Sequence, residues 1–301
     1  MALKLQPAME YLLTYGWAVL IIVIVLIALS QLGLLRGSMS GPKAAPGACE
    51  VYRSAVSYPQ LEGECIGGLP QFTAQLDGQS GYVSTSYQQN LISSYTITAW
   101  IKTNSSAGNP VFQDRGSGAG MSVTMEIGYN GGQSGHPGTV NCGVDSNGIW
   151  IGGYTSATVN DGNWHFVVCT LSATPGSAIV TSSLNAYVDG SPAPMSATQI
   201  GSATAPINGL GPSVIGYHAA WNNYFSGQIS NVQVYNTSLT SNQIQLLYQE
   251  GIGGAPVALQ NLVGWWPLNG NAQDYSGNDN NGASTGGLSY ISSWTKGYTL
   301  P

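Results

Sequence analysis

The acidic residues of this chain are too far apart in the sequence to mark a catalytic pair. Between Cys65 and Gln249 the carboxylates stand at least a dozen residues from one another, at Asp77, Asp114, Glu126, Asp145, Asp161 and Asp189. Glycosidases hold two carboxylates roughly 5 to 9.5 Å apart across the sugar, and no Glu-x-Asp-x-x-Glu strand motif places two here. A surface hydrolase would therefore need two of these residues to converge in a groove.

Nucleophilic and zinc chemistry also lack a sequence pattern. No Gly-x-Ser-x-Gly elbow is present, and His136, His165 and His218 have no recognisable triad context. No Cys-x-x-Cys pair or histidine cluster has the spacing of a zinc site. We therefore expect a binding or structural protein and not an enzyme.

A sugar ligand would need exposed aromatic rings, and several lie in surroundings rich in Gly and Asn. These candidates are Trp150, Tyr154, Tyr217, Trp221 and Tyr224. We single out Trp221 and Tyr224 as ligand-contacting residues. The alternative is that these aromatic rings pack in the core, as most buried Trp residues do.

The four cysteines predict two disulfides if the chain is exported. Four cysteines allow three connectivities, and we favour the local pairs Cys49–Cys65 and Cys142–Cys169. The first pair would close a short loop, and the second would join two predicted strands. Buried free thiols are the alternative.

Composition predicts a folded domain with few charges. Only 7% of the 301 residues are charged, against about 25% in an average soluble domain. The 17 Tyr and 8 Trp supply apolar surface for a core. The net charge of −6 and seven unclustered Lys and Arg residues exclude a nucleic-acid partner.

Past Cys65 the chain reads as short strands separated by turn residues, the all-β pattern of a sandwich or jelly roll. Residues 95–102 alternate, which predicts one buried face and one partly open face. Residues 164–171 are apolar on both faces, as in a central strand, and residues 184–188 run into a hairpin turn at Asp189-Gly190.

One helix is predicted within the β-rich part of the chain, after Asn236. Thr240 and Gln243 form a capping box, and Gly251 ends the helix after Tyr248. Its apolar stripe indicates a packing role.

Together these segments resemble a concanavalin A-like jelly roll of the laminin G type over about residues 70 to 252. The resemblance lies in the runs at 76–83, 96–101, 164–165, 187–190 and 225–235. It implies a binding or adhesion module and leaves the ligand open. Such domains often hold calcium, and Asp274, Asn278 and Asp279 are the best candidate ligands. A polar turn in which these side chains bond to the backbone is the alternative.

The tail looks like the opening strand and loop of such a domain, although it comes last. We expect residues 261–290 to fold back and complete their own sandwich as a circular permutation. Donation of this strand to a neighbouring subunit is the alternative, because an uncovered sheet edge is an aggregation hazard.

The N-terminal segment is predicted to cross a membrane. Residues 11–35 contain no charge, and a helix of this length rises far enough to span a hydrocarbon core of about 30 Å. Arg36 and a linker at 37–48 follow it. The cysteines and the sequons at Asn104 and Asn236 place the C-terminal part outside the cell, with both asparagines as glycosylation candidates.

The start of this segment, residues 4–18, resembles the class III signal of archaeal type IV pilin-like proteins. The resemblance implies cleavage between Leu5 and Gln6, which would make Glu10 the fifth residue of the mature chain. In that family the glutamate neutralises a neighbouring subunit's new amino terminus during assembly. A Glu solvated by lipid headgroups is the alternative reading of Glu10.

The predicted fold class is mainly β, with a single N-terminal transmembrane or pilin-like helix and a β-sandwich (jelly roll) ectodomain. The predicted parts are a leader at 1–5, a hydrophobic helix at 6–36, a linker at 37–48, a disulfide-closed neck at 49–69 and a jelly roll at 70–301. We expect a cell-surface filament subunit that contacts membrane lipid, self-associates through its helix and binds a glycan or surface protein. A non-polymerising, membrane-anchored carbohydrate-binding module is the alternative.

Overall fold

A computed structural model describes residues 6–31, 41–90, 92–106, 108–115, 121–128, 136–146, 149–198, 201–207, 209, 211–219 and 221–301, without the side chains of 6–14, 28–31, 114–115 and 121–122. The chain divides into two compact units, Met1–Ser40 and Gly41–Pro301. Each unit is therefore described separately.

The first unit contains the helix α1 (Gln6–Gln31), which is 26 residues long. It lies within the hydrophobic helix predicted over residues 6–36; Leu5 and residues 32–36 are outside the described residues. Glu10 belongs to α1, but its side chain is likewise outside the described part. In the part of the chain that the structure describes, no helix is both long enough and apolar enough to cross a membrane.

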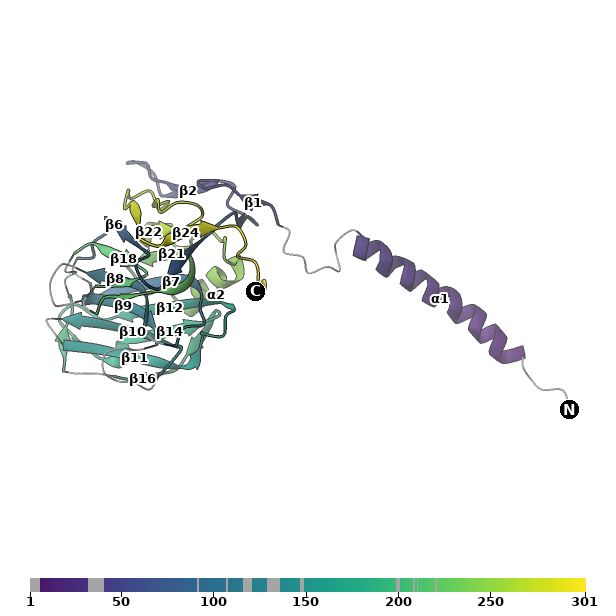
Figure 1. Ribbon diagram of the computed structural model, residues 1–301, viewed down its shortest axis with the longest axis horizontal. Helices are drawn as coiled ribbons and strands as arrows, with labels where there is room; N and C mark the ends of the chain where they lie inside the picture. Colours follow the sequence, from purple (N-terminus) through teal and green to yellow (C-terminus); the bar gives the residue numbers. More distant parts are fainter. Residues whose placement is uncertain are drawn as a thin grey trace. The chain divides into compact units, whose positions relative to one another are not determined.

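The second unit is a sandwich of two antiparallel sheets (Figure 1). The first sheet has eight strands in the order β16 (Met195–Ala197), β11 (Ile149–Thr158), β10 (Thr139–Ser146), β9 (Met121–Ile127), β8 (Asn109–Arg115), β18 (Ser213–Ile215), β6 (Tyr82–Thr85) and β23 (Gly282–Thr285). The second sheet has the order β15 (Ser191–Ala193), β14 (Leu184–Val188), β12 (Trp164–Ser172), β7 (Ser94–Lys102), β21 (Ser226–Tyr235), β5 (Thr73–Asp77) and β24 (Leu288–Ile291), with β22 (Leu262–Trp266) paired to β21. This architecture confirms the predicted mainly-β sandwich.

Smaller elements decorate the sandwich. They are β1 (Lys43–Ala44) paired with β4 (Leu69–Pro70), β2 (Cys49–Tyr52) with β3 (Gln60–Gly63), β13 (Ala178–Ile179) with β17 (Ala203–Thr204), β19 (Tyr217–His218) with β20 (Asn223–Tyr224), the helix α2 (Ser241–Glu250) and the 3₁₀ turns η1 (Thr181–Ser183) and η2 (Leu259–Asn261).

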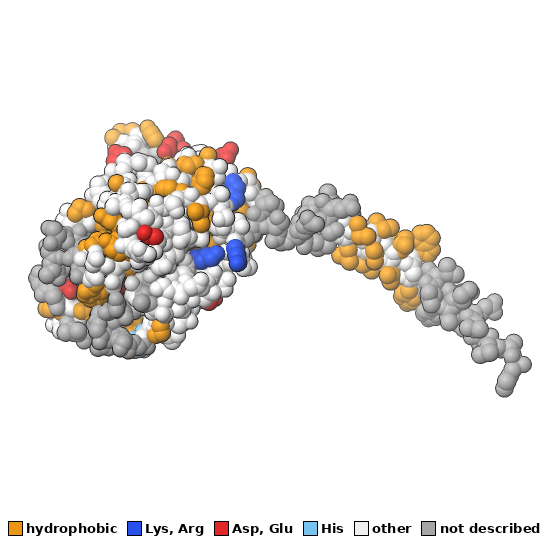
Figure 2. Space-filling model, in the orientation of Figure 1, with side chains coloured by type: hydrophobic (Ala, Val, Ile, Leu, Met, Phe, Trp, Pro, Cys, Tyr) orange, Lys and Arg blue, Asp and Glu red, His pale blue; other side chains and the backbone are white. Residues whose placement is uncertain are grey.

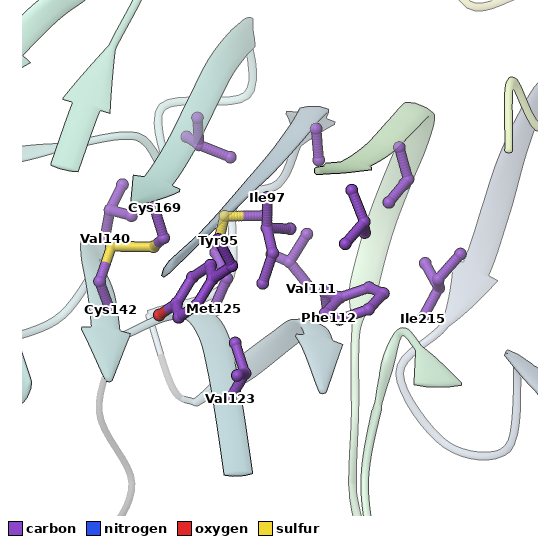
Figure 3. Packing of buried hydrophobic residues seen from close by; sticks show 14 of the residues in the cluster. Tyr95, Ile97, Val111, Phe112, Val123, Met125, Val140, Cys142, Cys169 and Ile215 are labelled. Atoms are coloured by element: carbon purple, nitrogen blue, oxygen red, sulfur yellow. A yellow bond between two sulfur atoms is a disulfide. The ribbon is translucent and has the colours of Figure 1, made fainter. Parts of the chain in front are cut away.

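The core lies between the two sheets. Tyr95 and Ile97 of β7 face Phe112 of β8 and Met125 of β9, and all four are fully buried (Figure 3). The period of two along each strand sends alternate side chains into this layer. Figure 3 also shows the disulfide between Cys142 of β10 and Cys169 of β12, which ties the first sheet to the second.

The outer face of β7 differs from the prediction. We expected this face to be partly open, yet Thr96, Thr98 and Trp100 are as buried as the core-facing residues. The Trp100 ring stacks on Tyr248 of α2, with 5.8 Å between centroids, and Tyr298 of the C-terminal segment packs edge-on against it at 5.4 Å. The prediction was wrong because residues far along the chain return to cover this face.

Three local predictions are confirmed. β12 is a central strand between β7 and β14 and is buried along nearly its whole length. β14 and β15 form a hairpin in which Asp189 and Gly190 both have positive φ, of 50° and 75°. This conformation is the reason for Asp-Gly at a two-residue turn. The Thr240–Gln243 capping box starts α2, and Gly251 caps its end.

The tail packs onto its own chain. β22 pairs with β21, β23 with β6 and β24 with β5. Trp265 and Trp266 are buried, with Trp266 in the core against Phe112. The C-terminal strands therefore occupy an edge position in each sheet.

The neck hairpin, which we define as residues 49–66, precedes the sandwich. It consists of β2 and β3 and is closed by the Cys49–Cys65 disulfide. Both disulfide pairings thus match those favoured from the sequence.

Candidate functional site

Three tyrosines, one of them distant in sequence from the other two, meet on one surface of the sandwich. Tyr217 of β19 and Tyr224 of β20 face each other across a two-stranded hairpin, with ring centroids 4.7 Å apart. Tyr82 of β6 stacks on Tyr217 at 4.9 Å. The hydroxyls of Tyr217 and Tyr224 both donate to the side-chain oxygen of Asn222, which holds the pair in register. All three tyrosines are only partly buried.

Trp221 lies at the tip of the same hairpin. Its ring stacks on His218 with 4.0 Å between centroids and an angle of 10°, and the ring of His218 is fully buried. Trp221 remains 38% exposed, the most of any described Trp in the second unit. A partly exposed indole on a rigid support can stack on a ligand without losing much side-chain entropy. We call Tyr82, Tyr217, Trp221 and Tyr224 the aromatic platform.

The five aromatic candidates from the sequence lie at two separate places in the structure. Trp221 and Tyr224, the two singled out, share one hairpin with Tyr217. Trp150 and Tyr154 lie on β11 instead. The Trp150 ring covers Gly143 and Gly152, where any added Cβ would collide with it, and Tyr154 stacks on His136. Tyr82 was missed, because it is 135 positions from Tyr217 and only the pairing of β6 with β18 brings it near.

A mostly polar row, which we call the polar row, runs from the aromatic platform across the first sheet; its members Gln113 and Thr124 are buried, and Ser84 and Val214 are partly buried. Ser84 lies opposite Val214, and Val214 lies opposite Gln113. Gln113 in turn pairs with Thr124 of β9. Tyr82 shares the outward face of β6 with Ser84, because Val83 between them points into the core. The aromatic platform and the polar row therefore occupy the same face of the sheet.

Glu126 extends this polar face. It is 2% exposed, and burial raises the pKa of its carboxyl to about 8. Asn141 of β10 lies directly opposite and donates to Glu126 Oε1 at 3.4 Å. The raised pKa favours the protonated carboxyl at neutral pH, and in that form the carboxyl can donate a hydrogen bond.

The structure also brings together three titratable groups that the sequence analysis left apart. His165, at the start of β12, has Asp189 Oδ2 2.8 Å from Nδ1 and Asp161 Oδ1 3.1 Å from Nε2. Both ring nitrogens are thus engaged by carboxylates, which leaves neither to act as a base toward a serine. Among the described residues, no group of three His, Cys, Asp or Glu side chains could hold a metal ion.

Asp77 organises the turn that follows β5. Asp77 accepts hydrogen bonds from the backbone N–H groups of Ser80, Gln79 and Gly81, and these bonds hold the pKa of its carboxyl well below the usual range. Its second oxygen accepts from the Ser80 hydroxyl at 2.9 Å. This carboxylate is therefore fixed within its own turn.

Asp274, Asn278 and Asp279 do not fit a calcium site in this arrangement. Asp274 Oδ1 accepts from the N–H groups of Trp265 and Ser276, and Oδ2 accepts from Ser276 Oγ and the N–H of Asn280. Asn278 turns its amide group, a donor, toward the carbonyls of Leu262 and Val263. Calcium requires six to eight oxygen ligands. These contacts are instead those of a polar turn in which Asp and Asn side chains bond mainly to the backbone, which was the alternative prediction.

The two sequon asparagines lie at the surface. Asn104 and Asn236 are both exposed. Asn236 Oδ1 accepts from the amide of Asn261 at 3.2 Å.

The fold and the aromatic surface define a lectin-like β-sandwich, and comparison with known families agrees. Residues 77–245 match the concanavalin A-like lectin/glucanases superfamily, so more than half of the chain is covered. The chain belongs to this superfamily. No curated protein sequence matches it.

Solved structures resemble this chain at low identity, and the first of those below shares its fold. A candidate carbohydrate-binding protein from Bacteroides ovatus is 18% identical with a TM-score of 0.52; the alignment covers 80% of this chain and 65% of that one. This chain thus spans just under two thirds of that protein's length. A heptameric SAP-like pentraxin from Limulus polyphemus is 16% identical over 73% of this chain and 94% of that one, with a TM-score of 0.46. Domain 4 of an extracellular GH43 arabinanase from Geobacillus stearothermophilus, in complex with arabinotriose, is 17% identical over 69% and 86%, with a TM-score of 0.42.

Proposed function

We propose that this protein is a cell-surface, lectin-like adhesion subunit whose sandwich binds a glycan on the aromatic platform. The observation that carries the proposal is the stacked group Tyr82, Tyr217 and Tyr224, with the exposed Trp221 in the turn of the hairpin that carries Tyr217 and Tyr224. Aromatic rings of this kind stack on the apolar faces of sugar rings, and neighbouring amides and hydroxyls bond to sugar hydroxyls. The superfamily to which the chain belongs includes lectins.

Binding, and not hydrolysis, is the activity that we propose for this surface. Asp161 and Asp189, which the fold brings to one place, are both bonded to His165. Glu126 is protonated and bonded to Asn141. A retaining or inverting glycosidase instead needs one ionised carboxylate and one acid facing a common sugar.

The N-terminal helix is proposed to anchor the chain or to pack in a filament core. The side chains from Val19 to Ile27 are all apolar and exposed in the isolated chain, so α1 needs an apolar environment to cover them. We propose that Glu10 is then an assembly residue and that the sandwich and its glycans at Asn104 and Asn236 are extracellular.

Glycan-array binding of the full-length chain in detergent micelles tests the ligand part of the proposal. We expect Trp221→Ala or Tyr224→Ala to weaken binding of the array hit by at least about tenfold, which corresponds to 1.4 kcal/mol. Leu246→Ala, at an exposed apolar residue of α2, is the matched control. Binding that survives both platform substitutions would place the ligand elsewhere.

Intact mass and electron microscopy of the protein sheared from its native cells test the anchoring part. A chain that begins at Gln6 and occurs in filaments would support the pilin-like subunit. An uncut monomer that stays in the membrane fraction would support the non-polymerising module.

A further inference from the structure

The neck hairpin is fastened to the sandwich along one strand only. Val51 of β2 is 3% exposed, and its N–H donates to the Tyr275 carbonyl at 2.9 Å. Arg53 donates from Nε to the Ser276 carbonyl and from Nη2 to the carbonyls of Leu259 and Leu262. In contrast, all four residues of β3 are exposed. An isolated two-stranded hairpin has only marginal stability. The contacts of Val51 and Arg53 and the Cys49–Cys65 disulfide therefore stabilise the neck hairpin, while β3 forms its open, solvent-facing edge.

The exposed part of the neck hairpin is unusually apolar. Val56 is 94% exposed, Tyr58 86% and Ile66 93%, and Tyr52 and Leu61 are also exposed. Single exposed apolar residues are normal, but five within one short disulfide-closed segment form a patch of the kind that marks an interaction surface. Figure 2 shows apolar side chains beside acidic ones at the top of the second unit.

The same hairpin concentrates negative charge. Glu50 of β2 and Glu62 of β3 are direct cross-strand partners, and Glu64 follows β3. Like charges placed opposite each other destabilise a hairpin. Across the described residues, the salt bridges involve His165 alone, so none neutralises these glutamates. Repulsion between these glutamates therefore lowers the stability of the hairpin, and a cationic group from outside the hairpin would relieve this repulsion.

Three lysines form a complementary patch on the sandwich. Lys43 lies over the Trp294 ring, 4.4 Å from its centroid, and Lys296 follows two residues later. The Lys102 ammonium donates to the Lys296 carbonyl, and burial together with the positive charge of Lys296 lowers the pKa of Lys102. These three residues, which we call the lysine patch, are three of the seven Lys and Arg residues in the whole chain. Figure 2 shows several blue side chains on one side of this unit.

We propose that the neck hairpin of one copy docks on the lysine patch of a second copy of this chain. The hairpin offers glutamates around an apolar tip, and the lysine patch offers unneutralised ammonium groups beside Trp294. Because the two surfaces differ, the contact is heterologous and propagates from copy to copy. The inference goes beyond the proposed function, since the contact is made by the second unit and requires neither a glycan nor packing of the N-terminal helices.

Zero-length cross-linking of the full-length chain tests this contact. Equal amounts of ¹⁴N- and ¹⁵N-labelled protein are mixed in detergent micelles and treated with a carbodiimide, which joins carboxylates to amines only where they touch. We expect mixed-isotope peptides that join Glu50, Glu62 or Glu64 to Lys43, Lys102 or Lys296. Their yield should fall as salt is raised from about 0.05 to 0.5 M, because screening weakens charge contacts.

Charge reversal makes the test specific. Glu62→Lys and Lys296→Glu should each reduce the mixed cross-links by at least about tenfold, and the double variant should restore them, since opposite charges again face each other. Glu250→Lys, at the exposed end of α2, is the matched control and should leave the yield unchanged. Intact disulfides and an unchanged circular dichroism spectrum establish that each variant is folded.

Three outcomes would overturn the proposal. The first is cross-links found only within one isotope, which would place the contact inside a single chain. The second is an equal loss of mixed cross-links in Glu250→Lys. The third is binding of a sulfated polysaccharide to the lysine patch without any mixed cross-link, which would assign this patch to a polyanionic glycan.

Discussion

The Nδ1 atom of His165 lies 2.8 Å from Oδ2 of Asp189, although the two residues are 24 positions apart. The type I′ turn that follows β14 carries Asp189 to this place, where its other oxygen accepts from the N–H of Phe166. Asp161 bonds to the opposite ring nitrogen, and the Tyr248 hydroxyl is the other titratable group within the field of Asp189. An imidazole is therefore held between two carboxylates at the surface of the second sheet.

This arrangement predicts a pH-dependent stability. Burial lowers the pKa of His165, but the hydrogen bonds and charges of Asp189 and Asp161 outweigh burial, so the pKa is raised above 6.5. The stabilisation is complete below the pKa of the unfolded state and is lost as the pH rises through the higher pKa of the folded state. We expect urea unfolding to show a falling free energy across this interval and His165→Gln to remove that fall. Asp189→Asn, which keeps an acceptor for Phe166, should act in the same direction.

Glu126 predicts a second pH dependence of a different origin. Burial raises the pKa of its carboxyl from 4.5 to about 8, so the folded state keeps a proton that the unfolded state releases. Between these two values each pH unit costs the folded state about 1.4 kcal/mol. Glu126→Gln preserves the shape without ionising, and its stability relative to the wild type should increase as the pH is raised from 5 to 8 in urea unfolding experiments.

Glu250→Gln is the control for this measurement, because Glu250 is exposed at the end of α2. It should show no comparable trend. A Glu126→Gln variant whose stability relative to the wild type is the same at pH 5 and pH 8 would contradict a buried, protonated Glu126.

The two disulfides should differ in their effect on global stability. Cys142–Cys169 joins the two sheets through fully buried sulfurs, whereas Cys49–Cys65 closes the neck hairpin. Replacing Cys142 and Cys169 together by Ala should cost about 3 kcal/mol, which for a domain of this size lowers Tm by roughly 6 to 12 °C. The same change at Cys49 and Cys65 should lower the main Tm less, because the hairpin can open without the sandwich. Equal shifts in scanning calorimetry would show that the neck hairpin unfolds with the core.

Local signals predicted much of the fold. The Asp189-Gly190 turn, the Thr240–Gln243 capping box and the apolar β12 each depend on neighbours within a few residues, and each was read correctly. The outer face of β7 was not, because Tyr248 and Tyr298 cover Trp100 from more than a hundred residues away. Alternation in one strand carries no information about such a cover.

At the candidate site, too, contacts between distant parts of the chain could not be predicted from local sequence. Trp221 and Tyr224 could be selected because Gly- and Asn-rich surroundings suggest an exposed loop. Tyr82 and the buried Glu126 could not be selected, since their partners Tyr217 and Asn141 are fixed by strand order and register. The Asp161–His165 spacing was visible in the sequence, but only the fold adds Asp189.

Trp294 provides the sharpest test that the C-terminal segment is part of the sandwich. It is fully buried, its indole N–H donates to the Pro70 carbonyl at 3.0 Å, and its own carbonyl accepts from the Trp164 indole at 2.8 Å. Trp294→Ala should therefore lower the free energy of unfolding in urea by about 3 to 5 kcal/mol. Trp294→Phe should lower it less, because Phe keeps most of the packing. Some loss should remain, because Phe has no N–H to donate to the Pro70 carbonyl. Trp221→Ala, at an exposed Trp, should change stability little. If Trp294→Ala were as stable as Trp221→Ala, the burial of the segment against Trp164 and Pro70 would not contribute to folding, and the sandwich would be complete without it.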